Sequence, residues 1–173
     1  MAKKVLVTYA SCTGFTQGVA EMIGKLMEDD HLQVDVLPMK DVKNLEDYQA
    51  VVAGSGIQAG AWLPEAMQFV QENRNELSKK PFAAFLVCMT LAMKNGENYR
   101  SHVQSWLQPV KSLVPTINTE VFAGGLDLKK IPSASDRLKF HLSTLFGVWK
   151  AGDHRDWAAI RLWSSELKSL LSQ

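Results

Sequence analysis

The stretch that decides the fold is Val5-Leu-Val-Thr-Tyr-Ala-Ser-Cys-Thr-Gly-Phe-Thr16. Its first half is apolar enough for a buried strand, and its second half is a hydroxyl-rich loop that leads into a helical pattern. A helix start carries unpartnered backbone N–H groups and a partial positive charge, so it attracts an anion. Ser11, Thr13 and Thr16 add hydroxyl donors, and Gly14 lets the backbone approach a ligand closely. The stretch therefore predicts a phosphate site.

The same loop indicates which kind of phosphate it suits. It contains no lysine, and it matches neither the nucleoside-triphosphate pattern Gly-x4-Gly-Lys-Ser/Thr nor the dinucleotide pattern Gly-x-Gly-x-x-Gly/Ala. Hydroxyls and amides without a cation favour a terminal monophosphate. A simple strand-to-helix turn, in which the hydroxyls only cap the helix, is the alternative that this loop alone leaves open.

Composition limits the class of protein. The chain has 173 residues, of which 46% are hydrophobic, and we expect one domain spanning residues 1–173. Its net charge of +1 argues against nucleic-acid binding, and its longest apolar run, Pro81 to Leu91, is too short to span a bilayer. No signal peptide is visible, so we expect a cytoplasmic protein. We also expect no metal site and no disulfide, with Cys12 a small buried filler.

Five strand-like runs alternate with helical patterns, which predicts a parallel sheet with crossover helices. The second run alternates polar and apolar residues, and the fifth does so more weakly, so both are expected at sheet edges. This gives a doubly wound α/β fold with strand order 2-1-3-4-5. The predicted strands are Lys4–Ala10, Leu32–Leu37, Ala50–Gly54, Phe82–Met89 and Ile117–Ala123.

Apolar stripes at three- and four-residue spacing predict four helices that cover the sheet. They include Val19 to Met27, Leu63 to Val70, Val103 to Val110 and Trp157 to Leu171, and we expect the tryptophans of the last one in the core.

Ligands of doubly wound sheets bind beyond the carboxyl ends of the strands, where strand order reverses. Glycine-bearing loops follow strands three and five of the predicted sheet, so a cofactor cleft is expected there together with the first loop. Trp62 either stacks on a bound ring or seals the sheet. From the loops after strands three, four and five the candidate binding residues are Ser55, Gly56, Ile57, Gln58, Ala59, Gly60, Trp62, Cys88, Met89, Thr90, Leu91, Gly124, Gly125 and Asp127.

An extra segment, about residues 127–152, lies between the fifth strand and the last helix. It carries a helical stripe at Leu138, Leu142, Leu145, Phe146 and Trp149. Residues 126–150 contain five basic and two acidic residues, a net charge of +3 against −2 for the remaining chain. Such a helix could rest on an anionic membrane, cover a cofactor or dock a partner; alternatively, it packs its stripe on the body and points its lysines to water.

The loop resembles that of the flavodoxin family, whose Thr/Ser-x-Thr-Gly-x-Thr motif holds the phosphate of FMN. Every fixed position is matched by Ser11, Cys12, Thr13, Gly14, Phe15 and Thr16. The resemblance implies a flavodoxin-like fold, FMN as cofactor, and a loop after strand three that flanks the flavin ring. With residues 51–60, 121–125 and 156–157, the insertion is similar to the menaquinone-dependent protoporphyrinogen oxidase branch, which oxidises a porphyrinogen and passes electrons to a membrane quinone.

Three functions follow from these observations. The first is an FMN oxidoreductase that uses a quinone or similar acceptor, in which the cofactor does the chemistry and no side chain is a candidate general acid or base. The second is a non-enzymatic electron carrier, and the third is a flavodoxin-like domain that has lost FMN. Expected partners are a redox partner or quinone, with peripheral membrane contact or a homodimer through the insertion and no nucleic acid.

Overall fold

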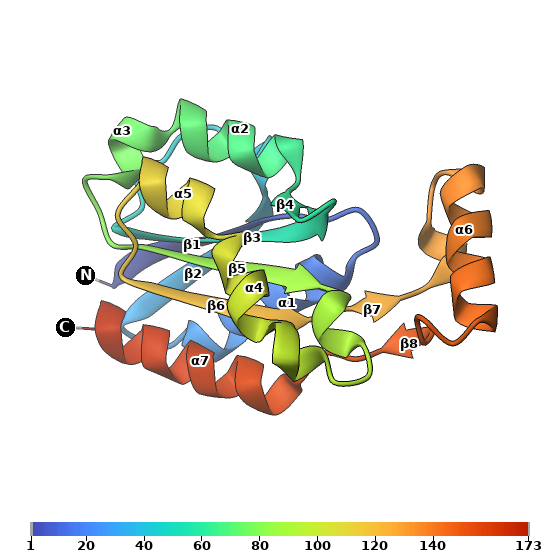
Figure 1. The fold of residues 1–173 in the computed structure, drawn as a ribbon. Helices are drawn as coiled ribbons and strands as arrows, with labels where there is room; N and C mark the ends of the chain where they lie inside the picture. Colours follow the sequence, from blue (N-terminus) through green and yellow to red (C-terminus); the bar gives the residue numbers. More distant parts are fainter. Residues whose placement is uncertain (1, 173) are drawn as a thin grey trace.

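Five parallel strands form the central sheet of the computed structural model, which describes residues 2–172 (Figure 1). Their order is β2-β1-β3-β5-β6, which confirms the predicted order 2-1-3-4-5 for the five main strands. The strands are β1 (Lys3–Ala10), β2 (Leu32–Pro38), β3 (Ala50–Gln58), β5 (Phe82–Cys88) and β6 (Asn118–Ala123).

The burial of each strand explains its place in the sheet. Every residue of β5 is buried, as expected for a strand covered on both faces. By contrast, β2 has one buried residue and β6 has two. The alternating sequences therefore stand at the two edges.

Helices cover both faces of the sheet (Figure 1). On one face, α1 (Phe15–Met27) and α7 (Trp157–Leu171) pack against the apolar side chains of β1, β3 and β5. On the other face lie four shorter helices: α2 (Pro64–Glu72), α3 (Arg74–Leu77), α4 (Arg100–Ser105) and α5 (Gln108–Leu113).

The prediction of one helix from Val103 to Val110 is wrong, because α4 ends at Ser105 and α5 begins at Gln108. Pro109 occupies the first turn of α5, where its missing N–H costs no hydrogen bond. The proline fits the start of a second helix better than the interior of one long helix. The apolar stripe continues across the break, and Val103, Leu107 and Val110 remain buried.

Three aromatic side chains join α7 to the sheet. The ring of Phe85 packs edge-on against Phe122 and Trp163, with centroids 6.1 and 5.8 Å apart. Trp163 donates its indole N–H to Asn118 Oδ1 at 3.0 Å, so its one polar group is satisfied inside the core. Gly54 lies on β3 directly beside Phe85, where a Cβ would overlap the phenyl ring.

The loop expected from Gly54 to Trp62 is instead a β-hairpin. Strand β3 continues to Gln58 and pairs antiparallel with β4 (Ala61–Trp62). Ala59 and Gly60 form the turn with φ of 50° and 74°, the left-handed pair that suits a tight hairpin. The sequence does not predict this hairpin, because its glycine-rich strand ends lack the usual alternating pattern.

The insertion stands away from the sheet on a short two-stranded base (Figure 1). Strand β7 (Gly125–Leu126) leads out and β8 (Gly152–Asp153) leads back, paired antiparallel. Between them lie the 3-10 turn η4 (Leu128–Lys130) and helix α6 (Ala134–Leu145), whose N-cap Ser133 accepts from Asp136 N–H.

Three further 3-10 turns are η1 (Met39–Asp41), η2 (Thr90–Ala92) and η3 (Gly96–Tyr99). No helix within residues 2–172 has the length and apolar character needed to cross a bilayer.

The contact between Gly54 and Phe85 yields a stability prediction. Gly54→Ala should lower the free energy of unfolding by about 1–3 kcal/mol, because the new methyl group overpacks a rigid aromatic cluster. Urea unfolding followed by circular dichroism measures the change. Adding Phe85→Leu should make the double variant less destabilised than the sum of the two single changes; strictly additive effects would contradict the proposed clash.

Candidate functional site

A cleft of about 510 Å³ opens at the carboxyl ends of β1, β3 and β5. Its volume lies within the range typical of small-molecule and cofactor pockets. Most of its lining is apolar or glycine. It is lined by fifteen of the twenty residues predicted from the sequence: Ser11, Cys12, Thr13, Phe15, Thr16, Gly56, Ile57, Gln58, Ala59, Gly60, Cys88, Met89, Thr90, Gly124 and Gly125.

One end of the cleft is the loop between β1 and α1. Gly14 is the N-cap of α1 in the left-handed conformation, with φ of 87°, and its own N–H donates to Ser11 Oγ at 3.0 Å. No side chain accepts a hydrogen bond as the cap of α1, and its first turn holds no acid. The backbone N–H groups of that turn are therefore available to an anion, beside the hydroxyls of Thr13 and Thr16.

Five predicted binding residues do not line this cleft. Ser55 is fully buried, where its hydroxyl donates to Gly56 O and accepts from Leu63 N–H, so it holds the β3–β4 hairpin together. Trp62 is 3% exposed and belongs to the core, which decides between stacking and sealing in favour of sealing. The other three are Gly14, which shapes the loop, Leu91, which lines a different cavity, and Asp127, which caps η4.

The two cysteines differ in their surroundings. Cys12 is exposed and lines the cleft, so the prediction of a buried filler is wrong. The polar loop around it carries few apolar neighbours, which explains its exposure. Cys88 is buried at the end of β5, and burial raises the pKa of its thiol. Cys88 is thus held in its neutral form at the floor of the cleft.

The insertion supplies the opposite wall of the cleft; the sequence left open that it covers a cofactor, but no residue beyond Asp127 was named as a binding residue. Phe140 and Asp136 line it together with Trp149, the last residue of the predicted stripe, while the other four residues of that stripe, Leu138, Leu142, Leu145 and Phe146, are exposed. The alternative in which that stripe packs on the body is therefore wrong. Further lining residues outside the prediction are Leu63, Val87, Trp106, Leu126, Ile131, Pro132 and Ser133.

The error has an identifiable cause. The predicted stripe marks the more apolar side of α6, whereas the side that lines the cleft carries one large apolar residue, Phe140. Steps of three and then four residues from the N-cap Ser133 connect Asp136 and Phe140 as a second face, with the same spacing as any helical stripe. Aromatic residues do not mark the inner face either, because Phe140 lines the cleft whereas Phe146 is 81% exposed.

Arg155 connects strand β8, at the base of the insertion, to the start of helix α1. Its guanidinium is stacked between Phe15 and Trp157, at 5.1 and 4.4 Å from the ring centroids. It donates to Phe15 O at 3.2 Å and forms a bidentate pair with Asp153, whose pKa it holds below the usual value. Gly18 leaves room for it, because a Cβ there would overlap the guanidinium. The start of α1 and strand β8 are thereby fixed to each other.

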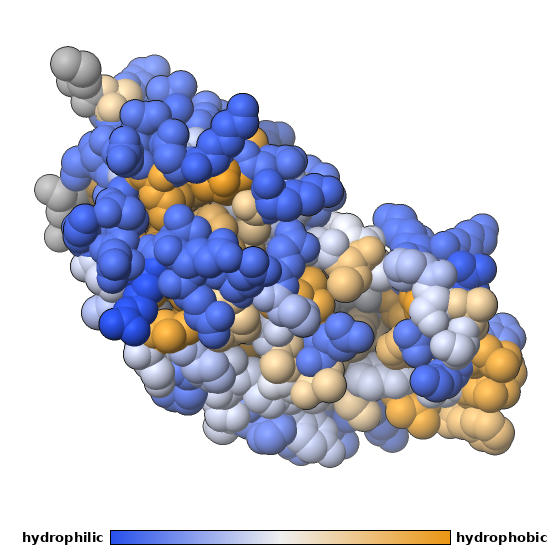
Figure 2. All heavy atoms as spheres, turned by 90° about the horizontal axis from the view of Figure 1, so that it is seen from above, coloured by the Kyte–Doolittle hydropathy of each residue, from blue (hydrophilic) through white to orange (hydrophobic). Residues whose placement is uncertain are grey.

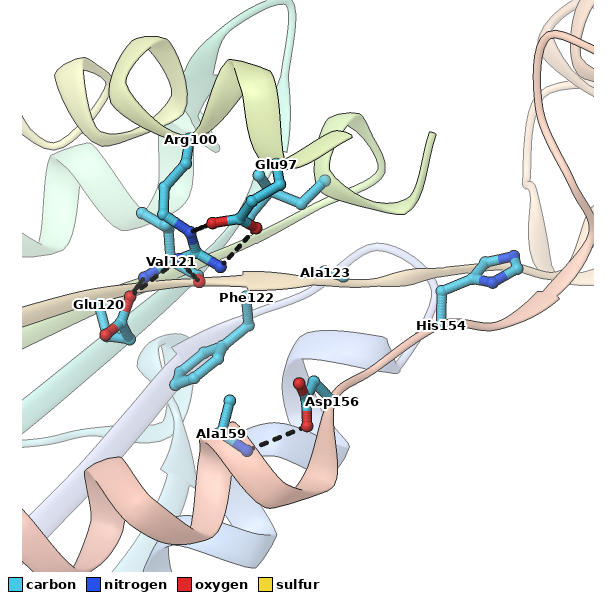
Figure 3. A pocket seen from close by; sticks show the side chains of 10 residues that line it. Glu97, Arg100, Glu120, Val121, Phe122, Ala123, His154, Asp156 and Ala159 are labelled. Carbon is cyan, nitrogen blue, oxygen red and sulfur yellow. Dashed lines mark hydrogen bonds and ion pairs between the residues drawn. The ribbon is translucent and has the colours of Figure 1, made fainter. Parts of the chain in front are cut away.

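A second cavity, of about 460 Å³, lies along the free edge of β6 (Figure 3). Its charged groups are largely paired with one another: Arg100 contacts Glu97 and Glu120 and donates to Val121 O at 3.2 Å. Asp156 is used as the N-cap of α7. These contacts satisfy the exposed backbone of an edge strand, so the cavity has a structural explanation.

Comparison with known proteins places this arrangement in a family. A model of the flavodoxin domain matches residues 6–142, and the chain belongs to that family. A protoporphyrinogen IX dehydrogenase (quinone) of Leishmania major is 27% identical over 177 residues, which cover 96% of this chain and 75% of that protein.

Solved structures support the fold. A flavodoxin mutant from Pseudomonas aeruginosa superimposes with a TM-score of 0.59 at 12% identity, covering 98% of this chain and 99% of the other. A Fusobacterium nucleatum flavodoxin solved with flavin mononucleotide gives 0.51 at 17% identity, covering 69% of this chain and 70% of the other. These similarities establish a flavodoxin-like fold.

The contacts of Arg155 generate a second prediction. Arg155→Lys should lower the free energy of unfolding by about 1–2 kcal/mol, because an ammonium group keeps the charge but loses the planar stacking and the bidentate pair. Thermal and urea unfolding measure the change. Arg161→Lys, on the exposed side of α7, is the matched control and should leave stability unchanged. Equal effects at both positions would show that the stacked geometry contributes nothing.

Proposed function

We propose that this protein binds FMN in the cleft and acts as an oxidoreductase, which takes hydrogen from a bulky organic substrate and passes electrons to a quinone or similar acceptor. The observation that carries the proposal is the continuity of the cleft. It runs from the uncapped start of α1 to the aromatic residues of the insertion, Phe140 and Trp149. One end suits a phosphate, and the other suits a bulky apolar molecule.

The residues present fit FMN. A terminal phosphate would be held by N–H groups of the first turn of α1 and by the hydroxyls of Thr13 and Thr16, without a cation. The flavin ring would lie between the β3–β4 hairpin at Gly56 to Gly60 and the end of β5 at Met89 and Thr90. Membership of the flavodoxin family and the FMN in the Fusobacterium flavodoxin support this choice of flavin.

The chain's own part in the reaction is binding and orientation. FMN, when bound, supplies the electron-transfer chemistry. Apolar side chains such as Ile57, Leu63 and Ile131 exclude water from the cleft. Phe140 and Trp149 offer aromatic faces against which the individual rings of a substrate can pack.

The charges of the cleft bear on the substrate. Among the described lining residues, Asp136 is the one carboxylate and none is a lysine or arginine. The name of the Leishmania relative supports a porphyrinogen as substrate. Without a cation in the cleft, porphyrinogens with few carboxylates should be preferred, and their acidic groups would remain at the rim.

The insertion also favours an enzyme over a simple electron carrier. A carrier exchanges electrons through an accessible edge of its cofactor, whereas here the insertion places two aromatic side chains across the cleft, Phe140 on α6 and Trp149 in the segment between α6 and β8. A carrier function stays as the alternative outcome of the assays below.

The cofactor is tested first. Thr13→Ala with Thr16→Ala should weaken FMN binding about a hundredfold or more, because two hydrogen bonds to a charged phosphate are lost. Quenching of FMN fluorescence measures the dissociation constant. Thr116→Ala with Thr119→Ala, two threonines outside the cleft, should leave it unchanged. Failure of the native chain to bind FMN would contradict the proposal. Equal FMN affinity of the two double variants would contradict the assignment of Thr13 and Thr16 to the phosphate.

The reaction is tested by anaerobic turnover of protoporphyrinogen with a menaquinone analogue. Turnover should exceed that of free FMN, and coproporphyrinogen, with more carboxylates, should react more slowly. Trp149→Ala should lower kcat/KM about threefold to tenfold while FMN affinity changes little, since a stacking face for the substrate is lost. Bound FMN without turnover above the free cofactor would favour the electron carrier.

A further inference from the structure

The outward face of α6 is an exposed apolar surface. Leu138, Leu142, Leu145 and Phe146 have exposed fractions of 60, 46, 69 and 81%. In the view of Figure 2, hydrophobic colour gathers at the end of the molecule that the insertion forms. Single exposed apolar residues are common on proteins, but four on one projecting helix end form a contiguous surface. We call these four residues the tip surface.

The tip surface is separate from the cleft. Leu138, Leu142 and Leu145 follow one another at helical spacing on one side of α6, and Phe146 extends that side past the end of the helix. Phe140 and Asp136 lie on the opposite side and line the cleft. Because the tip surface does not line the cleft, a role in covering the cleft does not explain why these four residues are apolar.

Basic side chains border the tip surface. By helical register Arg137 and His141 lie along one border of the stripe and Lys139 along the other; the Lys139 side chain is 75% exposed and forms an exposed ion pair with Asp136 at 3.3 Å, which contributes little at a surface. Residues 126–150 as a whole carry a net charge of +3, whereas the rest of the chain carries −2. Apolar residues flanked by cations are typical of helices that lie in the surface of an anionic bilayer.

We propose that the tip surface of α6 docks the protein on a membrane that contains anionic lipids. The leucines and Phe146 would enter the boundary between headgroups and acyl chains, and the flanking cations would contact lipid phosphates. Contact with a second copy fits less well, because a two-fold interface at the tip would bring two segments of charge +3 together.

Docking in this way has a geometric consequence. The tip surface and the inner wall of the cleft belong to one helix, so they are separated by about one helix diameter, on the order of 10 Å. An apolar molecule leaving the bilayer beside α6 would meet Phe140 and Trp149 after a short path. The docking surface itself requires no particular reaction in the cleft.

Vesicle sedimentation of the full chain tests the proposal. The protein should bind vesicles of phosphatidylcholine with phosphatidylglycerol, and it should bind pure phosphatidylcholine more weakly. Leu142→Ser with Phe146→Ser should lower the partition constant about tenfold or more, since two apolar side chains no longer enter the lipid. Lys139→Gln should lower it about fivefold on anionic vesicles alone, and added salt should reduce that difference.

The matched control is Leu162→Ser with Leu170→Ser. These leucines are 64 and 44% exposed on α7, so the change removes as many exposed apolar side chains away from the tip. The control should bind vesicles as the native chain does, and circular dichroism should show that both double variants are folded. Absence of vesicle binding, or equal losses in both double variants, would overturn the proposal. So would a native dimer in sedimentation velocity that the tip variant dissociates without any lipid binding.

Discussion

Parallel pairing of the five main strands is the constraint on which the site depends. Strands that run in one direction bring their carboxyl ends to the same edge of the sheet, and each connection must return by a crossover on one face. The loop at Ser11 to Gly14, the hairpin turn at Gly60, the turn after Cys88 and the glycines at 124 and 125 therefore meet, although more than a hundred residues separate the first from the last. The position of the cleft therefore follows from the topology of the strands, and the side chains of these loops determine only its lining.

Most of the sheet could be predicted because its signals are local. Strand β5 is apolar throughout and β2 alternates, so their central and edge positions follow from sequence. The position of the loop before α1 follows from Gly14 and the hydroxyls around it, but the sequence left open whether those hydroxyls cap the helix, and the structure shows no side-chain cap. What escaped prediction is set by long-range contacts: Ser55 is satisfied by the N–H of Leu63, and Trp62 turns into the core because β4 pairs with β3.

The insertion shows the limit of periodicity most clearly. A helical stripe identifies a helix and its apolar side, but not what that side contacts. In α6 the leucines with regular spacing face outward, whereas Phe140 on the other side lines the cleft. The base of the insertion is likewise held by a long-range contact, because Arg155 pairs with Asp153 and donates to the carbonyl oxygen of Phe15, 140 residues before it in the sequence. No local pattern could report such a contact.

The two-residue base of the insertion has an evolutionary consequence. Gly125 pairs with Asp153 and Leu126 with Gly152, so the chain leaves the sheet and returns to it at one point. Topologically, everything between them is a long hairpin loop, which can lengthen, shorten or disappear while the strands and α7 keep their places. A family built on this sheet can thus exchange the wall opposite its cofactor loop as a separate module, and acquire new specificities without refolding its core.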